Sequence, residues 1–184
     1  MGQPADEPLG NSARKEMEAN TIENTFIREV RVNYLSTNTE KFRIRGPDDV
    51  ARFFRQHAVD NSREQFMGLF LNGNHDVAAY SLISIGNENS APVQPSVLFQ
   101  RAILAGSVSI AVAHNHPSNN LQPSNEDLRL TRRLFQAADL LGIKLLDHVI
   151  VSDTTEISLN ETHGSIFRAE CTDPCTCAWK NLKQ

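Results

Sequence analysis

Two strongly apolar segments separated by a long amphipathic helix constrain the fold of this chain more than any other feature. The segments VSIAVAH (residues 108–114) and IKLLDHVIVS (residues 143–152) are apolar on both faces, which is typical of strands covered on both sides. Between them, residues 125–141 carry leucines at helical intervals and end before Gly142. The pattern predicts two buried strands connected through a helix.

Alternating apolar and polar residues predict further strands earlier in the chain. One β-hairpin is expected from residues 25–35 and 41–46, and another from residues 65–71 and 77–86 around the turn-rich NGNHD. EISL (residues 156–159) predicts one more short strand. Hairpin strands together with strands joined through helices predict an α/β (α+β) fold with a mixed β-sheet flanked by helices.

Two more helices are expected beside this sheet. Residues 46–59 have Pro47 at the helix start, acidic residues in the first turn, and an apolar face at the i, i+3, i+4 and i+7 positions. A helix over residues 97–105 is expected to be capped by Ser96 and to stop at Gly106.

The sequence predicts three parts of the chain. We expect a flexible leader over residues 1–24, the folded domain over residues 25–168, and a cysteine-containing tail over residues 169–184.

Composition and charge narrow the classes of function. The 184 residues suit a single domain, and the net charge of -4 argues against a protein that mainly coats a phosphate backbone. No apolar stretch approaches the roughly 20 residues of a membrane span, and the polar start does not resemble a secretory signal. We therefore expect no membrane association and a cytoplasmic location.

The three cysteines do not support a disulfide-based fold. Cys171, Cys175 and Cys177 are an odd number and lie together near the C-terminus. They could form a small metal site with His163, or they could be incidental thiols in a polar tail. The sequence leaves both interpretations open.

The segment HNHPSNNLQPSNED (residues 114–127) follows directly after the first buried strand and carries the candidate chemistry. His114 and His116 are two residues apart in an extended segment, so their side chains project in the same direction. Asp127 stands at the start of the next helix. Two imidazoles and a carboxylate suit Zn²⁺, and three protein ligands leave a fourth position for water, as in catalytic zinc sites.

A structural explanation of the same residues is equally available. SNED is a capping box, in which the Ser124 hydroxyl accepts from backbone N–H groups of the helix and the acid three residues later reciprocates. Ser124 and Asp127 could therefore be explained without a metal. Asp147 and His148, on the second buried strand, could orient a metal ligand or could form a satisfied polar pair in the core.

Four stretches resemble one known family in order and spacing: HNHPS, PSNED, TRRL and LLGIKLLDHVIVS. They are similar to the RadC-type branch of the JAB/MPN+ (JAMM) metalloprotease domains, and the resemblance covers roughly residues 27 to 168. It implies the JAB/MPN (cytidine deaminase-like) architecture. It also implies one zinc ion per chain held by His114, His116 and Asp127, with Ser124 helping to hold the oxyanion.

The resemblance also assigns a catalytic glutamate. The family uses a glutamate at the head of an early strand, and SREQFMGLFL places Glu64 at that position. The residues alone give Glu64 no distinction from other acidic residues. The implied activity is that of a zinc-dependent metallohydrolase that uses a zinc-activated water on a peptide or isopeptide bond of a peptide or protein substrate. Glu64 would move the proton.

The sequence differs from the usual pattern of the family at two places. Asn119 stands where the family usually has glycine, and Pro95, Ser96 and Val97 replace a usual Pro-Arg-Glu.

RadC relatives are associated with DNA repair, and full-length members carry an N-terminal helix-hairpin-helix region that is associated with DNA. We expect that residues 1–26 could not form such a region. The alternatives are a DNA-repair-associated nucleic-acid protein and a metal-stabilised binding module without catalysis. The sequence indicates neither the natural substrate nor the oligomeric state.

Overall fold

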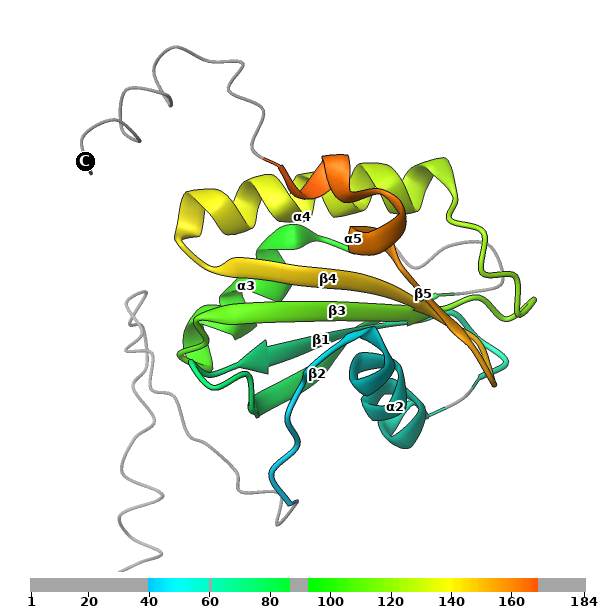
Figure 1. Ribbon diagram of the computed structural model, residues 1–184, viewed down its shortest axis with the longest axis horizontal. Helices are drawn as coiled ribbons and strands as arrows, with labels where there is room; N and C mark the ends of the chain where they lie inside the picture. The colour runs from blue at the N-terminus through cyan, green and yellow to red at the C-terminus, as the bar shows by residue number, and fades with distance from the viewer. Residues whose placement is uncertain (1–39, 60, 87–92, 169–184) are drawn as a thin grey trace, which may run out of the picture. The chain divides into compact units, whose positions relative to one another are not determined.

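The apolar segments of the sequence pair into one five-stranded sheet with the order β2-β1-β3-β4-β5. A computed structural model describes residues 40–59, 61–86 and 93–168, all within one compact unit (Figure 1). The strands are β1 (Gln65–Leu71), β2 (Val77–Ile85), β3 (Ser109–Asn115), β4 (Lys144–Val151) and β5 (Glu156–Ser158). The helices are α2 (Pro47–His57), α3 (Pro95–Leu104), α4 (Asn125–Leu141) and α5 (Leu159–Thr162), followed by the 3₁₀ turn η1 (Gly164–Phe167).

The sheet is mixed, as the sequence predicts. β3 pairs in parallel with β4 through the crossover helix α4, and β1 pairs antiparallel with both β2 and β3. Every residue of β3 is buried, which agrees with its apolar sequence and its central position. The carboxyl end of β3 and the start of α4 therefore meet at one edge of the sheet.

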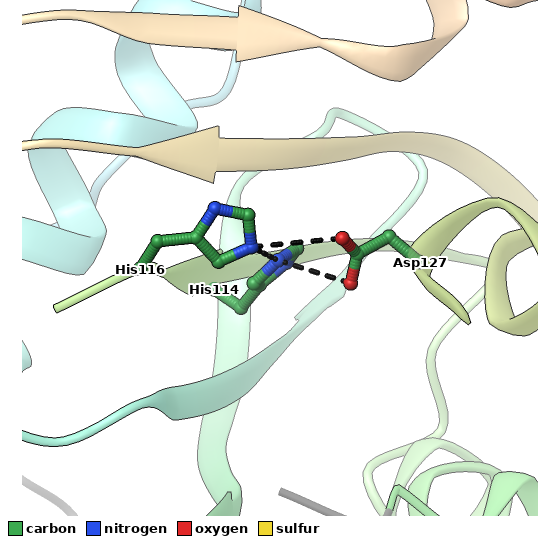
Figure 2. Close-up of side chains that lie close together, drawn as sticks. All are labelled: His114, His116 and Asp127. Atoms are coloured by element: carbon green, nitrogen blue, oxygen red, sulfur yellow. Dashed lines mark hydrogen bonds and ion pairs between the residues drawn. The ribbon is translucent and has the colours of Figure 1, made fainter. Parts of the chain in front are cut away.

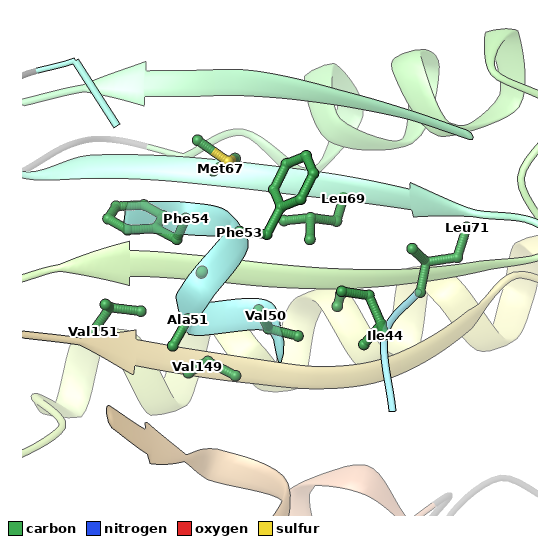
Figure 3. Close-up of a cluster of buried hydrophobic side chains, with 12 residues drawn as sticks. Ile44, Val50, Ala51, Phe53, Phe54, Met67, Leu69, Leu71, Val149 and Val151 are labelled. Atoms are coloured by element: carbon green, nitrogen blue, oxygen red, sulfur yellow. The ribbon is translucent and has the colours of Figure 1, made fainter. Parts of the chain in front are cut away.

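Helices cover both faces of the sheet. α2 packs on one face, where Phe53 and Phe54 meet apolar side chains of β1, β3 and β4 (Figure 3). α3 and α4 cover the other face, where Leu98 and Leu134 are fully buried. Gly68 in β1 allows α3 to approach closely, because a Cβ atom there would lie 2.5 Å from a Leu98 methyl group. The sheet and helices fix the positions of the polar groups described below.

Most predicted elements within the described residues are confirmed. The hairpin of residues 65–71 and 77–86 is β1 with β2, the helix of residues 46–59 is α2, and the strand–helix–strand unit is β3, α4 and β4. Gly142 ends α4 in the left-handed conformation at φ 68°. The pattern of apolar residues was therefore sufficient to locate the core of the domain.

Two local predictions are wrong. Ser96 does not cap α3, because the helix begins one residue earlier, at Pro95, whose fixed φ suits the first helical position; Gln94 is the N-cap and makes no side-chain cap bond. The expected strand of residues 41–46 is only an isolated bridge between Arg43 and Asp76, and the chain enters α2 directly afterwards, at Pro47.

Several other predictions lie outside the described residues. They are the leader of residues 1–24, the hairpin strand of residues 25–35, and the tail with its three cysteines. The limits of the domain stay predictions. No helix in the described ranges is both long and apolar enough to cross a membrane, and the cytoplasmic location also stays a prediction.

Candidate metal centre

The end of β3 brings the two histidines of the HNH segment together. His114 is the penultimate residue of the strand and is buried, while His116 follows the strand and is half-buried. Their Nε2 atoms lie 3.0 Å apart, which confirms that the two side chains project to the same side. The strand thus presents two imidazole nitrogens at one point.

The first turn of α4 adds a carboxylate to this point (Figure 2). Asp127 Oδ1 lies 3.3 Å from His114 Nε2, and Asp127 Oδ2 lies 3.5 Å from His116 Nε2. Asp127 also completes the predicted capping box, since its Oδ2 accepts from the backbone N and from the hydroxyl of Ser124, both at 2.7 Å. Capping therefore does not compete with metal binding, because the capping bonds hold the carboxylate beside the imidazoles.

The hydrogen bonds of His116 make its Nε2 atom available as a ligand. His116 Nδ1 lies against the carbonyl oxygen of Asn120, which can only accept, so Nδ1 carries the proton and a neutral ring presents a lone pair at Nε2. One ligand atom from each of His114, His116 and Asp127 lies within 4.8 Å of the others. Two neutral imidazoles and one carboxylate are a donor set that fits zinc.

The electrostatics of the cluster favour a charged carboxylate. Burial raises the pKa of Asp127, but hydrogen bonds that His114 and His116 donate when their Nε2 atoms carry a proton outweigh burial and hold the pKa well below its ordinary value. The hydrogen bond to Asp127 raises the pKa of His116, against the opposing effect of burial. The carboxylate is thus an anion over the whole physiological pH range.

The structure brings Glu64 to the same place. Glu64 directly precedes β1, whose ladder with β3 ends at the pair of Phe66 with His114, and the charges of His114, His116 and Asp127 act on its carboxyl group. Glu64 is half-buried, and burial raises the pKa of its carboxyl while the charges of the two histidines lower it. Its catalytic role, which only the resemblance indicates, stays a prediction.

Asn115 fixes the backbone around Glu64, a function that no sequence pattern indicated. Its Oδ1 accepts from Gln65 N at 2.8 Å, and its Nδ2 donates to the carbonyl oxygens of Arg63 at 3.1 Å and Asn61 at 3.4 Å. Asn115 is the residue between the two histidines, so its side chain points away from them. The two histidines of the HNH segment therefore supply candidate ligands, while the asparagine between them holds the backbone on either side of Glu64.

The two polar residues of β4 have different surroundings. His148 is fully buried and its Nε2 lies 2.8 Å from His114 Nδ1. Burial lowers the pKa of His148. Asp147 instead accepts hydrogen bonds from Ser158, from the backbone at the start of α5 and from the backbone N of His148.

The loop after His116 shapes the surface beside the site. Asn119 has φ 55°, the left-handed conformation expected where the family usually has glycine. Its amide donates to Asp153 Oδ2 at 3.0 Å. A cavity of about 90 Å³ opens here, lined by His116, Asn119 and Asp153 together with Phe54 of α2. The cavity shares His116 with the candidate metal cluster.

Comparison with known proteins assigns the family. The model of the family described as RadC-like JAB domain matches residues 44–165, which include Glu64 and all three candidate ligands. The chain is a member of the RadC-like JAB domain family. The observed mixed sheet with flanking helices is consistent with a JAB/MPN domain.

Curated bacterial relatives agree with this assignment. The chain is 39% identical over 127 residues to a UPF0758 protein of Alkaliphilus oremlandii, covering 69% of this chain and 55% of the relative. It is 39% identical over 124 residues to the UPF0758 protein YsxA of Bacillus subtilis, covering 67% and 54%. The chain thus spans about half the length of these relatives, whose names state no activity.

Proposed function

We propose that this RadC-like domain is a zinc-dependent hydrolase that cleaves a peptide or isopeptide bond. The observation that carries the proposal is the convergence of His114, His116 and Asp127 on one point, with Glu64 at the start of β1 close enough for the charges of the three residues to act on it. Membership of the JAB family supports the reaction class. Three protein ligands leave a position for water, as in catalytic rather than structural zinc sites, and a carboxylate outside the ligand cluster can move the proton.

Each residue has a separate task in this proposal. His114, His116 and Asp127 would hold the zinc ion, which, when bound, makes a water molecule more acidic and polarises the substrate carbonyl. Glu64 accepts one proton from the attacking water as its oxygen bonds to the carbonyl carbon. Glu64 then gives this proton to the amide nitrogen as the C–N bond breaks, so that a neutral amine leaves.

Ser124 is proposed to donate to the oxygen of the carbonyl during attack. Its side chain is exposed at the start of α4, and its hydroxyl bonds to Asp127 Oδ2. Donation to the substrate requires the hydroxyl hydrogen to turn away from Asp127. The Ser124 backbone N–H also bonds to Oδ2 at 2.7 Å, so the carboxylate keeps a donor when the hydroxyl turns.

Glu64→Gln is the variant that tests the proposal. We expect zinc content to remain that of the wild type and the turnover of peptide or isopeptide substrates to fall by about 10²–10⁴-fold, because the amide cannot accept the proton. Glu126→Gln is a matched control, since Glu126 is an exposed acid in the first turn of α4. It should keep most of the activity.

Assays of the wild-type protein on peptide, isopeptide and DNA substrates separate the alternative functions. A metal-stabilised binding module would bind zinc and show no turnover in the wild type. A nucleic-acid enzyme would act on DNA and leave peptide and isopeptide substrates intact. Either result would contradict the proposed hydrolase, as would a Glu64→Gln variant with undiminished activity.

A further inference from the structure

A continuous line of side chains connects two of the candidate zinc ligands behind the site. His114 Nδ1 lies 2.8 Å from His148 Nε2, and His148 Nδ1 lies 2.6 Å from the hydroxyl oxygen of Thr131. The Thr131 hydroxyl donates to the carbonyl oxygen of Asp127 at 2.6 Å. The line therefore begins at a ligand on β3, passes through β4 and ends at the backbone of a ligand on α4.

We infer that His148 and Thr131 are positioning residues that determine which ring nitrogen of His114 is free to bind zinc. The inference rests on the proposed zinc site. The protons of the line can be assigned from the chemistry of its members. The Asp127 carbonyl can only accept, so the Thr131 hydroxyl donates to it and has its oxygen available to accept from His148.

This assignment fixes the direction of every hydrogen bond in the line. His148 donates from Nδ1 to Thr131, so its Nε2 carries a lone pair and accepts from His114. His114 then carries its proton on Nδ1, and its Nε2 presents a lone pair toward His116 and Asp127. Zinc binding through His114 Nε2 requires this tautomer.

The opposite direction would be incompatible with zinc. If Thr131 donated to His148, then His148 would donate from Nε2 to His114, and His114 would carry its proton on the nitrogen that faces the other ligands. The Asp127 carbonyl would also lose the Thr131 donor. The bond between Thr131 and Asp127 therefore favours the direction that suits the metal.

The surroundings of the line prevent water from replacing it. Thr131 and His148 are both fully buried. The buried ring of Phe66 stacks beside His114 with a centroid distance of 6.1 Å and meets His148 edge-on at 5.4 Å. A ring nitrogen that loses its partner here stays without one, so His148 and Thr131 determine whether the Nδ1 atom of His114 has an acceptor for its proton.

Two pairs of variants test the inference through zinc affinity. His148→Phe keeps the ring shape but removes the acceptor for His114, while His148→Gln keeps an acceptor near the place of Nε2. Thr131→Val removes the hydroxyl and Thr131→Ser keeps it. We expect competition with a zinc chelator to show affinity about 10–100-fold weaker for the Phe and Val variants, and within a few-fold of wild type for the Gln and Ser variants.

Nitrogen NMR of the zinc-loaded wild type gives an independent measurement that needs no variant to fold. We expect His148 to carry its proton on Nδ1, and His114 to show a slowly exchanging Nδ1 proton. A His148 proton on Nε2, or folded Phe and Val variants with wild-type zinc affinity, would overturn the inference. Neither measurement uses a substrate, so an inactive protein that binds zinc would contradict the proposed hydrolase and leave this inference standing.

Discussion

Asp147 and His148 are neighbours in β4, yet they belong to two polar clusters of opposite character. The Asp147 carboxylate accepts from His148 N at 2.7 Å, Asn160 N at 3.0 Å and Ser158 Oγ at 2.6 Å. All three partners are donors, so the hydrogen-bonding capacity of this buried anion is met within the protein. The cluster holds β4, β5 and α5 together.

The cluster around His114 has the reverse balance. His116 Nε2, His114 Nε2 and the carboxylate of Asp127 face one another, and each of them presents a lone pair when both rings are neutral with the proton on Nδ1. Converging lone pairs repel unless a proton or a cation lies between them. The comparison teaches that a buried polar cluster complete in donors stabilises the fold, whereas one with an excess of acceptors is suited to bind a metal.

Zinc should therefore stabilise the protein by binding to the cluster of His114, His116 and Asp127, and not to the cluster around Asp147. At zinc concentrations about 1,000 times the Kd, linkage predicts an increase of about 4 kcal/mol in the free energy of unfolding. Asp127→Asn should lose this increase, because the neutral amide is a poor zinc ligand. Asp147→Asn should retain it. Denaturant unfolding with zinc and with a chelator measures both, and an equal zinc effect in the two variants would break the distinction.

Asp147→Ala should have the largest effect on the metal-free protein. It leaves the Ser158 hydroxyl and two backbone N–H groups without their acceptor, and we expect the free energy of unfolding to fall by about 2–4 kcal/mol. Zinc bound per folded chain should not change. A variant of wild-type stability would show that these hydrogen bonds do not hold α5.

Ser124→Ala should have an intermediate effect, because it removes the N-cap of α4. We expect a loss of about 0.5–2 kcal/mol in thermal or denaturant unfolding. Ser124→Thr keeps the hydroxyl and should differ from wild type by only a few tenths of a kcal/mol. If both variants lose stability equally, the capping box is not the source of the effect.

The pH dependence of stability should show the smallest effect. Burial raises the pKa of Asp147, so the folded protein holds this proton to higher pH than the unfolded chain. The stabilising contribution of protonation is complete below the unfolded pKa, about 3.9, and is lost as the pH rises through the folded pKa. The stability of wild type relative to Asp147→Asn should decline over that window. A difference that rises with pH would contradict the assigned direction.

The sequence was sufficient to predict what depends on local periodicity and spacing. The apolar patterns located β3, α4 and β4, and the spacing of His114, His116 and Asp127 indicated a shared point before any fold was known. These predictions succeed because two residues on one strand, and one at the start of the next helix, are placed by local geometry.

The remaining features depend on contacts between distant segments. Glu64 reaches the site because it precedes β1, which pairs with β3, and only the family resemblance could indicate this. His148 and Thr131 meet because β4 pairs in parallel with β3 while α4 crosses over both, and periodicity carries no information about that register. The error at Ser96 has a local cause, since Pro95 moved the helix start by one residue.

The zinc content of purified protein tests the central claim most directly. Elemental analysis should find one zinc per chain in the wild type and almost none in folded His114→Ala and His116→Ala variants. The same metal content in wild type and variants, or a wild-type protein without zinc after loading, would contradict a metal centre built by the end of β3 and the start of α4.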